Sequence, residues 1–129
     1  MLEKEQALNN CSISTLLPSS QNNLVYSKDT LVNVNPGQCI AYRIIPTNRA
    51  NLPVSNFVMS DTLQKAGVNN ATVSSVLAVP TYNSDDYATD SAKVGKNDVP
   101  VKTKILSIAE RAQRVFYFNT KYGATNSNP

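Results

Sequence analysis

The stretch from Pro36 to Asp61 constrains the fold of this chain more than any other. A Pro-Gly turn opens it, and Ile40, Tyr42 and Ile44 then occupy alternate positions. Successive side chains of a β-strand point to opposite faces, so this alternation predicts a half-buried strand. A second alternating run, Phe57, Met59 and Asp61, predicts another strand that ends at an acidic residue before a turn. Two such strands need a larger sheet around them.

The rest of the chain repeats this pattern between polar loops. Residues 3–8 are interpreted as a leading edge strand or arm, and β-prone runs predict further strands within 24–27, 30–35, 71–82, 99–105 and 115–122. One segment fits another period, because Ile105, Ile108, Ala109, Ala112 and Val115 recur at helical spacing. A short helix near 106–114 is therefore an alternative to a turn there. The chain of 129 residues is predicted to form one all-β domain.

Composition narrows the function classes. The net charge of +3 comes from 12 basic and 9 acidic residues that are scattered singly, whereas nucleic-acid binding needs a concentrated basic stripe. No apolar run approaches the roughly 20 residues of a membrane span. The chain has no histidine, and it lacks both a G-x-S-x-G nucleophile motif and a glycine-rich phosphate loop. We therefore expect no enzymatic activity, no cofactor, no nucleic-acid partner and no direct membrane insertion.

The two cysteines, Cys11 and Cys39, stand 28 positions apart. Structural zinc is not expected, because zinc sites use closer cysteine pairs and helping histidines. Residue types alone leave a disulfide and two free thiols equally open. The alternation places Cys39 on the face opposite Ile40 and Ile44, so a bonded partner would belong to a segment over the outside or edge of the sheet.

Several short motifs together resemble the bacterial conserved-repeat domain of cell-surface proteins, an immunoglobulin-like module that often occurs in tandem copies. The central motifs are a Pro-Gly turn, a strand with tyrosine that leads to asparagine, and a second strand that closes on aspartate: Pro36-Gly37, Tyr42, Ile44, Asn48, Val54, Phe57, Met59 and Asp61-Thr62-Leu63. A final alternating run, 106–122, completes the pattern. One subgroup also starts with a matching segment and carries two cysteines, here Lys4, Gln6, Ala7, Leu8, Cys11 and Cys39. Pro46 and the segment 109–111 depart from the pattern, because the family usually has a β-branched residue at the first and a Pro-Gly turn at the second.

The resemblance implies an immunoglobulin-like Greek-key β-sandwich of about seven strands, exported to the bacterial cell surface or secreted. It also implies a turn at 109–111 and a Cys11–Cys39 disulfide, since exported proteins meet an oxidising compartment. The whole of 1–129 would be one repeat, with 1–10 as a leading junction or arm and 123–129 as a trailing linker. Neighbouring repeats would be its partners, and any export signal would lie outside these residues. The implied function is a non-enzymatic structural spacer; the alternative is an adhesive module whose loop 83–98 engages a protein or glycan.

That loop and two turns hold the candidate site residues. The loop is the longest polar stretch, is expected on the surface, and offers possible ligand contacts: Tyr82, Asp85, Asp86, Tyr87 and Asp90. Its aspartates suit calcium, but the EF-hand spacing is absent, so a solvated loop is the favoured interpretation. Asn48 and Asp61 are predicted to fix turns by bonding backbone amides. A less favoured alternative is a Lys-Asn isopeptide bond that joins Lys28 or Lys121 to Asn48 or Asn119 beside Asp61.

Overall fold

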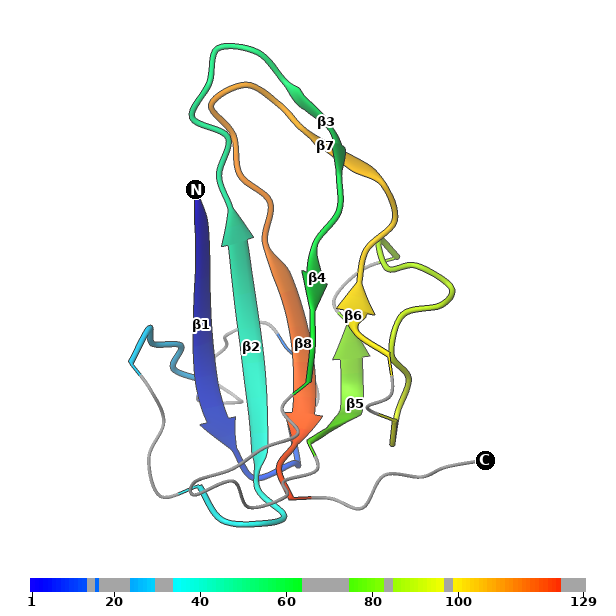
Figure 1. Ribbon diagram of the computed structural model, residues 1–129. Coiled ribbons are helices and arrows are strands. Elements are labelled where there is room, and N and C mark those ends of the chain that lie inside the picture. Colours follow the sequence, from blue (N-terminus) through cyan, green and yellow to red (C-terminus); the bar gives the residue numbers. More distant parts are fainter. Residues whose placement is uncertain are drawn as a thin grey trace.

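The computed structural model of the chain describes residues 1–13, 16, 24–29, 34–63, 75–82, 85–96 and 99–123 (Figure 1). Within this part the chain is all β and has no helix. Its eight strands are β1 (Leu2–Asn9), β2 (Cys39–Pro46), β3 (Val54–Phe57), β4 (Ser60–Asp61), β5 (Val76–Tyr82), β6 (Val101–Lys102), β7 (Leu106–Ile108) and β8 (Phe116–Lys121). The predicted strand 30–35 lies almost wholly outside the described residues, as do the trailing linker beyond residue 123 and the start of the 71–82 run.

A four-stranded antiparallel sheet, in the order β1-β2-β8-β5, forms one layer. The Pro-Gly turn before β2 is built as the sequence predicts, because Gly37 adopts a φ of 91° that favours glycine. The Gly37 amide donates to the Tyr122 carbonyl at 2.8 Å, and the Tyr122 amide donates to the Gln38 carbonyl at 2.8 Å. The β2–β8 pairing therefore continues down to the turn.

A narrower layer covers the inner face of this sheet. β3 pairs with β7 and β4 pairs with β6, so residues 54–61 run antiparallel to residues 101–108 with an interruption in the middle (Figure 1). The gap between the two ladders is bridged where the Thr103 amide donates to the Met59 carbonyl at 2.9 Å and the Thr103 hydroxyl accepts from the Met59 amide at 3.0 Å. These two layers form an open antiparallel structure and not a closed barrel.

Alternation predicts the residues that face this core correctly. Ile44, Phe116 and Phe118 project from the four-stranded sheet and pack against Met59 and other side chains of the covering layer: Leu63, Tyr87, Ala92 and Val101. The β2–β8 register places Ile44 opposite Phe116 and Tyr42 opposite Phe118. The ring centroids of Tyr42 and Phe118 are therefore only 5.3 Å apart. The hydrophobic core therefore lies between the sheet and the two-stranded layer.

The prediction that β2 is only half buried is wrong. Cys39 and Ala41, on the face opposite the core, are both fully inaccessible to solvent. The N-terminal region covers that outer face, where Leu16, Ile13 and Tyr26 pack with Ala41 and Tyr117. A contact between segments this far apart has no local sequence pattern, so periodicity alone could not reveal it.

The helix alternative near 106–114 is also wrong, and the turn is present. β7 occupies residues 106–108, after which the Ala112 amide donates to the Ala109 carbonyl at 3.2 Å. Arg111 has a φ of 52°, in the left-handed region that a right-handed helix excludes. The Asn48 amide then donates to the Ala112 carbonyl at 2.8 Å, a bond that ties this turn to the end of β2.

Candidate functional site

The described part of the 83–98 loop, residues 85–96, lies at the surface as predicted, but it also packs several side chains into the core. The Tyr87 side chain is only 7% exposed and belongs to the core, and its hydroxyl donates to the Tyr117 carbonyl at 2.9 Å. Ser91 and Ala92 are also buried. The loop backbone runs beside β6, where the Ala88 amide donates to the Lys102 carbonyl at 3.0 Å. The loop therefore extends the covering layer as a third strand-like segment.

The two tyrosines proposed as ligand contacts stack on each other. Their ring centroids lie 3.9 Å apart and their planes are inclined by 15°. The half-buried Tyr82 hydroxyl lies 2.8 Å from the Ser91 hydroxyl and also donates to the Ala92 carbonyl. Burial raises the pKa of both phenols. Tyr87 is thus a core residue and not an exposed ligand contact.

Two acidic residues of the loop form ion pairs with different basic residues. The Asp86 carboxylate lies 3.4 Å from the Arg114 guanidinium, and the Asp90 carboxylate lies 2.8 Å from the Lys102 ammonium. The hydrogen bond from Lys102 lowers the pKa of Asp90. Asp85 is exposed. Across the described residues, no three acidic, cysteine or histidine side chains gather closely enough to hold a metal ion.

Asn48 makes bonds in two directions from a nearly buried position. Its Oδ1 accepts from the Ala50 amide at 3.0 Å, which closes the turn that follows β2. Its Nδ2 donates to the Leu52 carbonyl at 2.8 Å and, at 3.2 Å each, to the carbonyls of Ile108 and Ala109. The side chain is 6% exposed. One asparagine therefore joins the β2–β3 turn to the β7–β8 turn.

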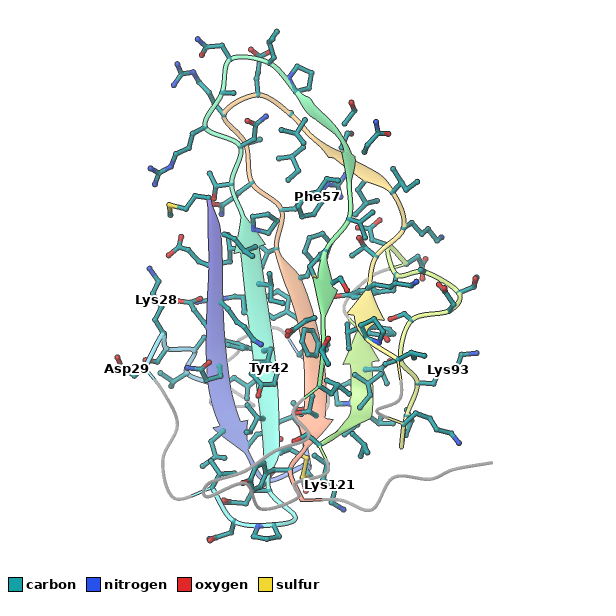
Figure 2. The ribbon with its side chains drawn as sticks, in the orientation of Figure 1. Lys28, Asp29, Tyr42, Phe57, Lys93 and Lys121 are labelled. Carbon is teal, nitrogen blue, oxygen red and sulfur yellow. A yellow bond between two sulfur atoms is a disulfide. The ribbon has the colours of Figure 1, made fainter. Side chains whose placement is uncertain are left out.

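Asp61, the other predicted turn-fixing residue, forms an ion pair between the layers. Its carboxylate lies 2.7 Å from the Lys4 ammonium of β1. The same ammonium stands 4.7 Å above the ring of Tyr42, the residue labelled on β2 in Figure 2. Burial, followed by the charge of Asp61, raises the pKa of Tyr42 to about 12. Sequence reasoning missed this cluster, because Lys4 and Asp61 are 57 positions apart (61 − 4) and lie in segments interpreted separately.

The cluster divides an open side of the sandwich into two hollows. A polar hollow of about 110 Å³ lies on one side of it and is lined by Tyr42, Leu63, Ser75 and Thr120 among others. A more apolar groove of about 260 Å³ lies on the other side, lined in part by Leu2, Ile44, Phe57, Val58 and Met59. Both share Lys4 and Asp61. Together the two hollows make this open side of the sandwich a concave surface.

The chemistry that this surface can supply is limited. A general acid or base works best with a pKa near the operating pH, whereas Tyr42 with a pKa of about 12 stays protonated at neutral pH. Lys4 and Asp61 neutralise each other. Most groups considered for an isopeptide bond have other partners: Lys28 pairs with Glu3, Asp61 pairs with Lys4, and the Asn48 and Asn119 side chains bond backbone carbonyls. The Lys4–Asp61 ion pair, which we call the Lys4–Asp61 latch, therefore connects β1 to β4.

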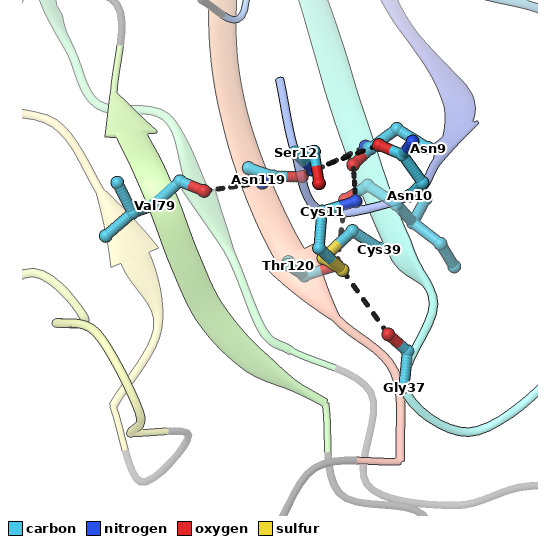
Figure 3. Close-up of a disulfide and its surroundings, with 10 residues drawn as sticks. Asn9, Asn10, Cys11, Ser12, Gly37, Cys39, Val79, Asn119 and Thr120 are labelled. Carbon is cyan, nitrogen blue, oxygen red and sulfur yellow. Dashed lines mark hydrogen bonds between the residues drawn. A yellow bond between two sulfur atoms is a disulfide. The ribbon is translucent and has the colours of Figure 1, made fainter. Parts of the chain in front are cut away.

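The Cys11–Cys39 disulfide is present, with the two Cα atoms 5.2 Å apart (Figure 3). Cys39 begins β2 opposite Asn9, the last residue of β1, and Cys11 follows in a tight turn that the Asn9 Oδ1 closes by accepting from the Cys11 amide at 2.9 Å. A polar bridge crosses the sheet beside it. Asn9 Nδ2 donates to Asn119 Oδ1 at 3.3 Å, and Asn119 Nδ2 donates to the Val79 carbonyl of β5 at 3.2 Å.

The buried side-chain amide of Asn119 thus bonds the irregular part of the edge strand β5. The pairing of β5 with β8 shifts register between Leu77 and Tyr82, and the Val79 carbonyl lies within that shift. Asn119 is fully inaccessible, and its side chain satisfies this carbonyl while it is itself held by Asn9. The disulfide and this bridge together tie β1, β2, β8 and β5 at one end of the sheet.

The chain matches no family model, no curated protein and no solved structure. In the described residues, no helix is both long and apolar enough to cross a membrane. Support for a function therefore comes from the geometry of the chain itself and from its short motifs.

Proposed function

We propose that this protein is a non-enzymatic spacer module of a bacterial cell-surface or secreted protein, linked in series to neighbouring repeats. One observation carries the proposal: the chain enters and leaves the main sheet at opposite ends (Figure 1). The Met1 amino group donates to the Thr47 carbonyl beside the end of β2 at 2.8 Å, whereas Tyr122 pairs with Gln38 before the start of β2. Modules joined through such ends extend a chain instead of folding it back.

Covalent and polar cross-links give additional support. The disulfide fits an oxidising, extracellular setting, and its closure of 28 positions stabilises the fold by about 3.6 kcal/mol on the chain-entropy model. Asn48 joins two turns at one end of the sandwich, and Asn119 joins strands at the other. A spacer needs both ends to be rigid, since the relative orientation of neighbouring modules depends on them.

The proposed likeness to immunoglobulin domains is one of architecture. Two antiparallel layers enclose the core, as in many surface modules that share the sandwich without sharing its topology. The strand order differs, because β8 lies between β2 and β5. In an immunoglobulin constant domain the first and last strands belong to different sheets, whereas β1 and β8 here share one sheet. We therefore propose an immunoglobulin-like sandwich with its own strand order.

The adhesive alternative has less support. Tyr87 is buried and Tyr82 is stacked on it, so the loop 83–98 lacks the exposed aromatic side chains that would give it contact area. Asp86 and Asp90 already pair with basic residues of the same chain. The apolar groove between β1 and β3/β4 is a second surface on which a ligand could bind, but its size and lining do not specify one.

Small-angle scattering on one, two and three copies joined head to tail tests the proposal. The eight residues of β2 span about 27 Å at roughly 3.4 Å per residue, so each added copy should lengthen the particle by at least that amount. Copies that pack side by side, so that the maximum dimension hardly grows, would overturn the spacer assignment. A single copy that retains a ligand from a defined set of surface glycans would favour the adhesive alternative.

A further inference from the structure

We infer that the module carries tension along its long axis through β1, β2 and β8, and that its disulfide diverts this tension past residues 12–38. The inference rests on the proposed spacer function and adds a mechanical role to it. It depends on three features of the structure: the register of the central strands, the position of the disulfide, and the side chains that cross the β1–β2 ladder.

The three strands are arranged so that a pull on the two ends of the chain shears them. β1 and β8 are both antiparallel to β2, which lies between them. β1 begins at one end of the sheet and β8 finishes at the other (Figure 1). The hydrogen bonds of an antiparallel ladder lie perpendicular to the strands, so a force along the strands loads all of them together. The load falls on eight residue pairs between β1 and β2 and on six between β2 and β8.

The disulfide sits where β1 passes its load to the rest of the chain. Cys11 follows the far end of β1, and Cys39 is the first residue of β2. Tension that has travelled along β1 therefore passes through the sulfur atoms into β2 and bypasses the intervening loop. That loop contributes Ile13, Leu16 and Tyr26 to the outer cluster. The side chains that cover the outer face of the sheet therefore carry no tension while the disulfide is intact.

Side chains reinforce the ladder most exposed to shear. Glu5 and Arg43 are directly opposed on β1 and β2, and the Arg43 Nε donates to the Glu5 carboxylate at 2.6 Å. The Arg43 guanidinium also lies 4.7 Å from the Tyr26 ring. On the inner face, Lys4 is held to Asp61 of β4. A slip of β1 along β2 has to break these contacts as well as the backbone bonds.

Single-molecule force spectroscopy on the full chain, with handles attached by a non-thiol reaction, tests the inference. Pulling through the two ends should require a higher unfolding force than pulling through residues 1 and 49. Met1 and Arg49 lie at the same end of the β1–β2 pair and touch through the Met1 sulfur, so that second geometry opens the ladder one pair at a time. Equal forces in the two geometries would overturn the shear mechanism.

The length released on end-to-end unfolding tests the diversion. With the disulfide intact, the 28 positions from Cys11 to Cys39 should not extend, which at ~3.5 Å per residue shortens the released length by about 98 Å. Added reductant, or the double variant Cys11→Ser/Cys39→Ser, should restore that length. A released length that reductant leaves unchanged would overturn this part. Scattering that still shows extended arrays, together with a low unfolding force, would reject the mechanical role and leave the spacer function standing.

Discussion

Replacement of Asn48 by alanine should destabilise the fold far more than loss of another asparagine in the same turn. Its Nδ2 has two protons for three carbonyl acceptors, so its four contacts amount to about three full hydrogen bonds. At about 1 kcal/mol each, their loss lowers the free energy of unfolding by about 3 kcal/mol. The substitution also removes a donor from the buried carbonyl of Ile108, and this adds to the loss of stability.

Urea unfolding followed by far-ultraviolet circular dichroism, under oxidising conditions, measures this effect. With a urea m-value of about 1.5 kcal/mol/M, a loss of that size moves the midpoint down by about 2 M. Asn51→Ala is the matched control, since the Asn51 side chain accepts one bond from Arg111 at the exposed surface. The control should change stability by less than about 0.5 kcal/mol.

A third variant, Asn48→Asp, separates the two halves of this interaction. It keeps the acceptor for the Ala50 amide but points a carboxylate oxygen at the carbonyls that Nδ2 now serves. We expect it to be no more stable than Asn48→Ala. This role of Asn48 is refuted if Asn48→Ala unfolds at the same urea concentration as Asn51→Ala, or if Asn48→Asp retains the stability of the original chain.

Two further predictions concern pH and backbone strain. Burial raises the pKa of Tyr42 from 10.0 to about 12 and raises that of Tyr26, Tyr82 and Tyr87, so the stability from these neutral phenols is complete below pH 10 and is lost as the pH rises toward 12. Tyrosinate absorbance should therefore develop at higher pH in the native protein than in denaturant, and coincident curves would contradict the burial. Gly123→Ala should cost about 1–2 kcal/mol or more, because the glycine has a φ of 70° and a Cβ there would stand 2.9 Å from the Pro36 side chain. Gly37→Ala, with φ of 91° and open space around it, isolates the strain alone, and equal urea midpoints for the two would refute the contribution of the clash.

Local alternation was enough to predict the strands that form the main core. Phe116, Phe118 and Thr120 share a buried face as predicted, and Met59 faces them from the covering layer. These residues obey the period of two because each strand has one face toward the same core. The turn at Ala109–Arg111 followed from the resemblance, whereas helical spacing alone favoured the wrong structure, since apolar residues of a strand and of the turn after it can fall by coincidence at helical intervals.

Contacts between distant segments could not be predicted in the same way. Ala41 is buried because residues from the N-terminal region pack over it, and nothing near Ala41 encodes that cover. Tyr87 is surrounded in sequence by polar residues typical of a surface loop, yet it pairs with Thr103, just after β6, and its ring enters the core. The Lys4–Asp61 latch likewise forms only when β1 and β4 come together. In each case the determining partner is fixed by topology and not by local composition.

Three of the many asparagines of this chain, Asn9, Asn48 and Asn119, form side-chain hydrogen bonds near the two ends of the sandwich. Backbone groups lose their ladder partners where strands end, and a buried group without a partner is costly. Asn48 supplies donors and an acceptor to two turns at one end of the sandwich, while Asn9 and Asn119 do so beside the disulfide at the other. A neutral amide can both donate and accept, so it closes these ends without placing a charge there. In the proposed spacer, neighbouring modules would meet at these two ends, where the asparagine side chains hold the turns and strands together.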